Sequence, residues 1–196
     1  MALTCSSPAF SKRQGDFDAK AYAAAVAKAE AGDPAVDYLW LRKQASAQLG
    51  YAEDNWADWE KADALIDTSP DQALAMARAR ISGVWTDFMA HIVAQLALEK
   101  LGKQEEAGRE QRITAAIISS IAGGHKGTNA ADSFNAVNVA EEYRLLFLLH
   151  WKFEGQSLVN KDGHSFDVFD VTDLKTGQKR QLWFNIDVFF GKEFGL

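Results

Sequence analysis

The sequence of 196 residues is poor in cysteine, proline and basic charge, and it contains no long apolar run. Its single cysteine, Cys5, excludes an internal disulfide framework and a zinc finger built on cysteine ligands. Its 21 basic residues are outnumbered by 27 acidic ones, which excludes the basic surface that a general nucleic-acid-binding protein needs. The longest purely aliphatic or aromatic run, 145–149, is far shorter than the roughly 20 residues that cross a bilayer, so no transmembrane segment is expected.

The first 15 residues are expected to form a disordered tail, because serine, proline and glycine interrupt every periodicity there. This stretch has no apolar leader, so the protein is expected in the cytoplasm as the chain stands. The small-x-small segment 9–11, followed by Lys12 and Arg13, leaves an alternative open. In that alternative a leader is missing from the N-terminus, and the protein is periplasmic or otherwise exported.

Helical spacing of apolar residues runs from residue 16 to residue 122, and capping residues and glycines divide it into six helices. Asp33 and Pro34 are typical of a helix start, and Ser69, Pro70 and Gln72 have the spacing of a capping box. The expected helices are 18–31, 34–50, 53–67, 70–81, 85–101 and 105–121. Antiparallel helices joined by short turns predict stacked helical hairpins.

Two stretches of this helical region, 60–70 and 101–107, resemble parts of a tetratricopeptide repeat. The usual period of roughly 34 residues cannot be laid twice along the chain. The resemblance is therefore to degenerate helical hairpins rather than to a regular array.

From residue 123 the composition changes to a β-rich region, 123–196, which is expected to form one compact unit with the helices. A glycine-rich polar loop at 123–129 opens it, and strands are expected at 134–139, 153–159, 165–172 and 180–188. The last two should form a hairpin whose turn places Gly177 in the left-handed region. The apolar phase slips within 165–172, which predicts a bulge or a strand covered on both faces. A very apolar helix at 139–150 should pack between the sheet and the helical layer.

Six segments of the sequence, taken in order, carry a resemblance to a known family: 116–120, 123–128, 137–143, 156–158, 163–168 and 183–187. Together they are similar to a bacterial domain-of-unknown-function family, numbered four-nine-one-nine. The resemblance covers roughly residues 16 to 191 and is specific in the C-terminal half. It implies a tetratricopeptide-like helical half followed by a small β-rich half, and often an export signal. No activity is established for that family, so the resemblance implies a fold and no chemistry.

Three residues are candidates for a catalytic or metal site assembled in space: His125, His164 and Asp167. Alternation along a regular strand would point His164 and Asp167 to opposite faces, so only a bulge could bring them together. The competing interpretation is that these two residues make hydrogen bonds at the end of the hairpin. Glu141 and Glu142 could act as an acid–base pair, although two glutamates in the first turn of a helix more often stabilise that helix.

Candidate binding residues are two tryptophans and two amides. Trp56 and Trp59 are spaced to share one helix face, and an exposed pair would mark a binding surface. Gln156 and Asn185 lie in segments that carry the family resemblance. We expect them to be buried amides that bond loop backbone, rather than residues that contact a substrate. No metal site with typical ligand spacing is found, and no cofactor is expected.

These observations predict an α+β fold, in which degenerate tetratricopeptide-like helical hairpins pack on a small antiparallel β-sheet with one embedded helix. The first functional hypothesis is a non-enzymatic interaction or scaffold protein that binds a protein or peptide partner in a groove of the hairpins. The second is a hydrolytic or metal-assisted enzyme with its site between the 123–127 loop and the His164 hairpin. The third is an exported protein associated with the cell envelope.

Overall fold

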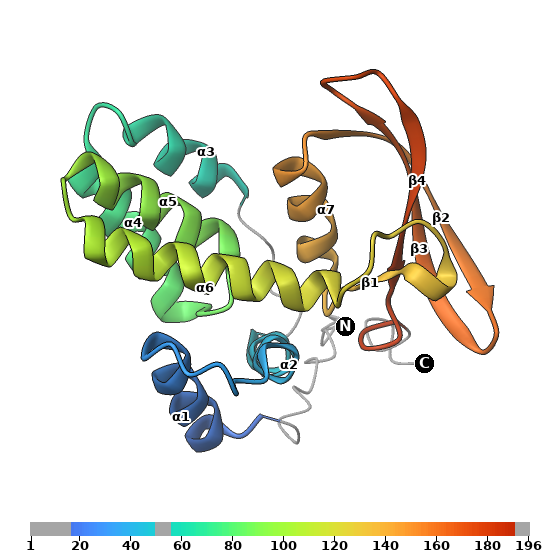
Figure 1. The fold of residues 1–196 in the computed structure, drawn as a ribbon, viewed down its shortest axis with the longest axis horizontal. Helices are drawn as coiled ribbons and strands as arrows, with labels where there is room; N and C mark the ends of the chain where they lie inside the picture. Colours follow the sequence, from blue (N-terminus) through green and yellow to red (C-terminus); the bar gives the residue numbers. More distant parts are fainter. Residues whose placement is uncertain (1–16, 50–55, 191–196) are drawn as a thin grey trace, which may run out of the picture.

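The computed structural model describes residues 17–49 and 56–190, with the side chains of 48, 49, 56 and 57 left aside. The tail predicted over residues 1–15 and the side chain of Trp56 lie outside this part of the chain. Its secondary structure comprises seven α-helices, one short 3₁₀ helix and four strands. The fold is α+β, as predicted, with helices packed against a mixed sheet (Figure 1).

Six helices form the first part of the described chain: α1 Ala19–Glu30, α2 Tyr38–Leu49, α3 Trp56–Leu65, α4 Pro70–Gly83, α5 Phe88–Lys100 and α6 Gln104–Ala122. Helix α6 crosses the middle of this part, with α3, α4 and α5 on one side and α1 and α2 on the other (Figure 1). Successive helices α3 to α6 pack as antiparallel neighbours. A likeness to tetratricopeptide hairpins stays a prediction.

The start of α2 and the capping of α4 differ from the predictions. Helix α2 begins at Tyr38 rather than after Pro34, because the carboxylate of Asp37 accepts a hydrogen bond from the backbone N–H of Trp40 at 2.9 Å. Asp33 instead accepts from the N–H of Ala35 at 2.9 Å and holds a turn. Helix α4 begins after Ser69 as predicted, but the side chain of that residue makes no capping bond.

The four strands are β1 Phe134–Asn135, β2 Trp151–Lys161, β3 His164–Asp173 and β4 Lys179–Asn185, in the order β1-β4-β3-β2. Strands β2, β3 and β4 are antiparallel neighbours, whereas β1 runs parallel to β4. The predicted antiparallel sheet is present in β2, β3 and β4, and the short strand β1 adds a parallel edge that makes the sheet mixed. The chain reaches β1 from the end of α6 through the glycine loop, so it enters the sheet beside β4 in the same direction.

The slip in apolar phase within the third strand has a structural cause. Consecutive residues 166–169 of β3 are all buried, so this strand is covered on both faces. A register shift does occur in the hairpin, but it lies in the partner strand β2 between Phe153 and Gly155. The second of the two predicted alternatives accounts for the pattern in β3.

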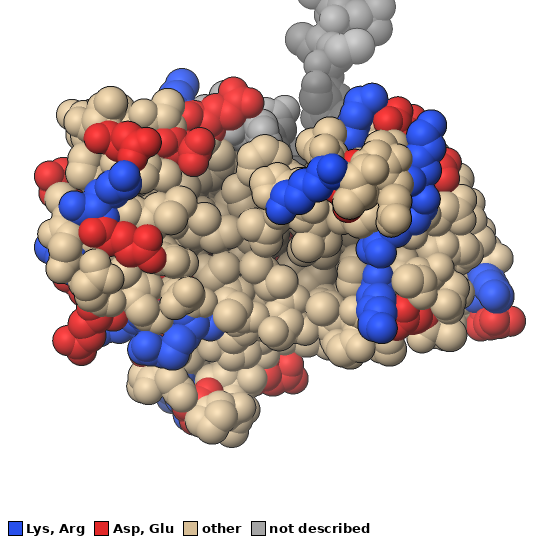
Figure 2. All heavy atoms as spheres, turned by 45° about the horizontal axis from the view of Figure 1, so that its top comes forward, with Lys and Arg blue, Asp and Glu red and all other residues tan. Residues whose placement is uncertain are grey.

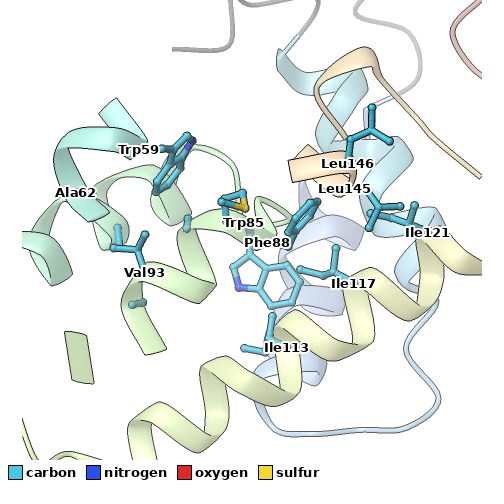
Figure 3. Packing of buried hydrophobic residues seen from close by; sticks show 14 of the residues in the cluster. Trp59, Ala62, Trp85, Phe88, Val93, Ile113, Ile117, Ile121, Leu145 and Leu146 are labelled. Carbon is cyan, nitrogen blue, oxygen red and sulfur yellow. The ribbon is translucent and has the colours of Figure 1, made fainter. Parts of the chain in front are cut away.

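Helix α7, Val139–Leu148, lies between the other helices and the sheet (Figure 1). Its first turn is capped by Asn138, whose side chain accepts from the backbone N–H of Glu141 at 3.0 Å. A single apolar core runs from α1 through α7 to β4 and Phe189. In Figure 3, Ile113 and Ile117 of α6 lie beside Trp85, while Leu145 of α7 lies near the end of α6. No helix in the described ranges is long and apolar enough to cross a membrane.

Candidate functional site

The structure gives each of the three predicted catalytic candidates a different partner. The Nδ1 atom of His125 lies 3.4 Å from the Asp132 carboxylate, and that of His164 lies 2.6 Å from the Asp187 carboxylate. Asp167 is buried with 8% of its surface exposed and belongs to neither pair. Within residues 17–49 and 56–190, no three His, Cys, Asp or Glu side chains gather closely enough to hold a metal ion. The three candidates therefore do not form a metal-ligand set.

The glycine loop uses its own polar groups to build the fold. The Asp132 carboxylate accepts from the hydroxyl of Thr128 at 2.7 Å and from the backbone N–H of Lys126 at 3.1 Å. These two bonds hold the pKa of Asp132 below its usual range. The carbonyl of Gly127 accepts from the N–H of Trp183 in β4 at 2.9 Å. The loop thereby fastens the entry of β1 to the sheet.

The predicted binding residues do not gather at one place. Trp59 has only 6% of its surface exposed and packs in the core, so it offers no exposed tryptophan pair with Trp56. Gln156 is exposed rather than buried, and its side-chain oxygen accepts from the hydroxyl of Tyr143 at 2.9 Å. Asn185 does bond loop backbone, because its side-chain oxygen accepts from the N–H of Asp187 at 3.1 Å.

Helix α7 buries charged side chains beside its apolar core residues and exposes several other apolar side chains. Its charged residues Glu141, Glu142 and Arg144 are buried. Its exposed apolar side chains are those of Val139, Tyr143 and Phe147, which recur every four residues along one face. Figure 2 brings the top of Figure 1 forward and shows uncharged residues covering the middle of that side of the molecule. Burying charge is costly unless it is paired, so the partners of these residues fix the position of α7.

One of these partners lies in the sheet. Burial raises the pKa of Asp167 in β3, while the neighbouring side chains of Gln156 and Glu142 act in the opposite direction and lower it. The pKa of Tyr143 is also raised, first by burial and then by the negative charges of Glu142 and Asp167. This group of side chains joins α7 to the sheet. The glutamates that the sequence placed in an ordinary first turn are thus interior groups.

Another partner group lies on the helical side of α7. Arg144 Nη1 lies 3.0 Å from the carboxylate of Asp87, which also accepts from Arg80 Nε at 2.7 Å. Close by, His91 has only 1% of its surface exposed. Its Nδ1 lies 2.6 Å from Glu110, and its Nε2 lies 2.7 Å from the carbonyl of Trp85. These buried polar groups hold helices together.

A groove of about 400 Å³ opens between α1, the 31–37 connection and α6. Its apolar lining comes from both sides and includes Ala29, Val36, Tyr38, Ile113 and Ala116. Charged side chains border this lining: Glu30 and Asp33 on one wall, and Arg109 and Arg112 on the α6 wall. The groove combines an apolar floor with cationic groups on one rim, which suits a segment carrying both apolar and anionic side chains.

Some hydrogen-bonding groups of the groove have partners within the protein, and others have none in the described part of the chain. Glu30 accepts from the indole N–H of Trp85 at 3.2 Å, and Asp33 accepts from a backbone N–H of its own turn. The guanidinium groups of Arg109 and Arg112 and the hydroxyl of Ser119, all exposed, have no hydrogen-bond or ion-pair partner in the described part of the chain. The groove thus presents free donors on the α6 wall, while each carboxylate on the other wall accepts one hydrogen bond from within the protein.

Sequence reasoning predicted a groove in the helical half but not its position or its two arginines. Arg109 and Arg112 are three residues apart on one helix face, a pattern that an ordinary solvated face also shows. Only their missing partners distinguish them, and partners cannot be read from the sequence. Comparison of the chain with protein-family models, with curated proteins and with solved structures finds no match. The family resemblance stays a prediction.

Proposed function

We propose that the protein is a non-enzymatic interaction protein that binds a segment of a partner protein in the groove between α1 and α6. The observation that carries this proposal is the groove itself, with its volume of about 400 Å³, an apolar floor and free donors on one rim. A space of this size accommodates a few side chains of a peptide. Packed helical pairs commonly present such surfaces to extended segments.

The groups that border the groove favour binding over reaction chemistry. Glu30 and Asp33 are engaged with Trp85 and with a turn, so neither is placed as a free general base. Arginine remains protonated at every ordinary pH and does not transfer protons. The alternative of an enzyme at the 123–127 loop gains no support, because His125 and His164 each face a separate aspartate.

The proposal is tested by selecting random displayed peptides on the wild-type protein and measuring their affinity for a variant with a filled groove. Ala116 lines the groove, and Ala116→Trp should occupy it. Ala115 is its exposed neighbour on α6 and does not line the groove, so Ala115→Trp is the matched control. Thermal unfolding of both variants would establish that they fold.

We expect selected peptides to bind the wild type and the Ala115→Trp variant alike and to lose affinity for the Ala116→Trp variant. If no selected peptide distinguishes the two variants, the groove is not the binding site and the proposed function is wrong. A peptide that binds all three forms equally counts against the proposal as well.

A further inference from the structure

We propose that the groove recognises an acidic segment of a partner protein, with two carboxylates on alternate residues held by Arg109 and Arg112. This inference rests on the proposed function and specifies the ligand of the same site. The partner segment is extended, and an apolar side chain beyond the second carboxylate packs on the floor of the groove.

The first argument is that Arg109 and Arg112 lack the partners that the other described arginines have. Among the described arginines, three have carboxylate partners within 3.0 Å in buried or partly buried pairs: Arg42, Arg80 and Arg144. Arg78 pairs with Glu106, and Arg180 stacks over a tryptophan ring. Within the same part of the chain, Arg109 and Arg112 alone lack such a partner, and both border the groove.

The second argument is charge complementarity. The two free guanidinium groups prefer carboxylates, which they can bind through paired N–H donors. Glu30 and Asp33 keep their negative charge while they accept hydrogen bonds from neutral groups, so the cationic donors are confined to the α6 wall, and a carboxylate ligand must lie against that wall. Because the whole chain carries a net charge of −6, long-range attraction for an acidic ligand is absent. Recognition therefore depends on contacts within about one Debye length, roughly 8 Å at physiological salt.

The third argument is spacing. Side chains three residues apart on a helix have Cβ atoms about 5–6 Å apart. In an extended peptide, side chains on alternate residues lie about 6–7 Å apart on the same face. Beyond the two arginines, the lining of α6 continues with Ile113 and Ala116, so an apolar side chain two residues further along the peptide would lie over them.

Phosphate groups also bind arginine, so a nucleic acid is the competing ligand. Its backbone would need a broad basic surface, whereas the groove offers two arginines beside an apolar floor in an acidic protein. These observations favour the acidic peptide.

The test measures fluorescence anisotropy of labelled, end-capped peptides with the sequences Glu-Ala-Glu-Ala-Val and Gln-Ala-Gln-Ala-Val. The site variant is Arg109→Gln with Arg112→Gln. The control, Lys175→Gln with Lys179→Gln, removes the same charge from an exposed turn and strand end outside the groove. A single-stranded oligonucleotide serves as competitor.

We expect the acidic peptide to bind the wild type and the control variant alike, and to lose roughly ten- to hundredfold in affinity for the site variant. The glutamine peptide should show the same loss on the wild type. Equal weakening by site and control variants would overturn the inference, and so would stronger binding of the oligonucleotide than of the peptide.

The selection experiment with the filled groove separates failure of this inference from failure of the proposed function. Selected peptides that depend on an open groove but carry no excess of Asp or Glu would overturn the acidic ligand and leave the interaction site standing. If no selected peptide depends on the groove, both proposals are wrong.

Discussion

Arg42 and Glu141, separated by 99 positions in the sequence, meet in the interior as a bidentate ion pair. Arg42 Nε donates to Glu141 Oε1 at 2.9 Å, and Nη2 donates to Oε2 at 2.6 Å. The guanidinium also donates to the hydroxyl of Ser120 at 3.0 Å and to the carbonyl of Asn135 at 2.5 Å. The carboxylate accepts in turn from the N–H of Val137. The pair therefore joins α2, α6, β1 and α7 at one point.

Removing one member of this pair should be far more damaging than removing an exposed pair. Glu141→Leu leaves a buried guanidinium without its counter-charge and should cost about 3–5 kcal/mol of unfolding free energy. Arg42→Met combined with Glu141→Leu should cost less, because no buried charge is left alone. The exposed pair of Arg78 and Glu106 is the control, and Arg78→Met should cost less than about 1 kcal/mol. Urea unfolding measures all of these, and a small effect of Glu141→Leu would contradict the assignment.

Gly127 is expected to be the least replaceable glycine of the loop. It has φ +68°, and a Cβ built there would lie 2.5 Å from a ring carbon of Phe134. Gly124 has φ +82° but nothing within 4 Å of such a Cβ, so its substitution measures the cost of the positive φ without a steric clash. Gly124→Ala should cost roughly 1–2 kcal/mol, and Gly127→Ala clearly more, by denaturant unfolding. Equal costs would mean that the Phe134 ring moves aside freely.

Local structure was largely predictable because its signals are local. The helices and strands all occur within a few residues of their predicted bounds, and the turn glycine Gly177 has the predicted positive φ of 72°. The start of α2 was predicted at the wrong residue because two possible capping residues lie close together in the sequence. Asp33 and Asp37 can each cap a helix, and the former holds a turn while the latter caps α2.

Long-range relationships were not predictable from local pattern. Glu141 and Glu142 fit the first turn of a helix, where carboxylates stabilise the N-terminus, and nothing near them in sequence indicates that Arg42 and Asp167 will enclose them. The parallel pairing of β1 with β4 likewise depends on how the glycine loop delivers the chain to the sheet. The candidate site was missed for the same reason, because the free state of Arg109 and Arg112 follows from what the fold leaves unpaired.

Removing the hydroxyl of Tyr22 should increase the stability of the folded protein. The Tyr22 oxygen is buried and has no hydrogen-bond partner in the described ranges, and burial raises the pKa of this phenol to about 12. Tyr22→Phe should therefore stabilise the protein by roughly 1 kcal/mol at neutral pH. Because the folded state holds the proton more tightly than the unfolded chain, in which the phenol has its ordinary pKa of 10.0, wild-type stability should fall as pH rises through about 12. Denaturant unfolding at alkaline pH should show a smaller decline in the variant, and an equal decline would contradict this assignment.

Asp167 should make stability rise, not fall, as the solution becomes mildly acidic. Burial raises the pKa of its carboxyl above the usual 3.8, so the folded state takes up a proton more readily than the unfolded chain. The resulting contribution is full below 3.8 and is lost as pH rises through the raised pKa. Asp167→Asn removes the buried charge, so the stability of the variant relative to wild type should increase from about pH 4 to about pH 7.

Asp173 supplies a control of opposite sign for this measurement. The backbone N–H groups of Lys175 and Thr176 hold the pKa of its carboxyl below 3.8, so its contribution is present above that value and is lost as pH falls through the lowered pKa. Asp173→Asn should therefore lose stability relative to wild type as pH rises from strongly acidic conditions. Urea unfolding of both variants across the acidic range compares the two slopes. Slopes of the same sign would mean that Asp167 ionises more readily in the folded protein than in the unfolded chain, which would contradict a pKa raised by burial.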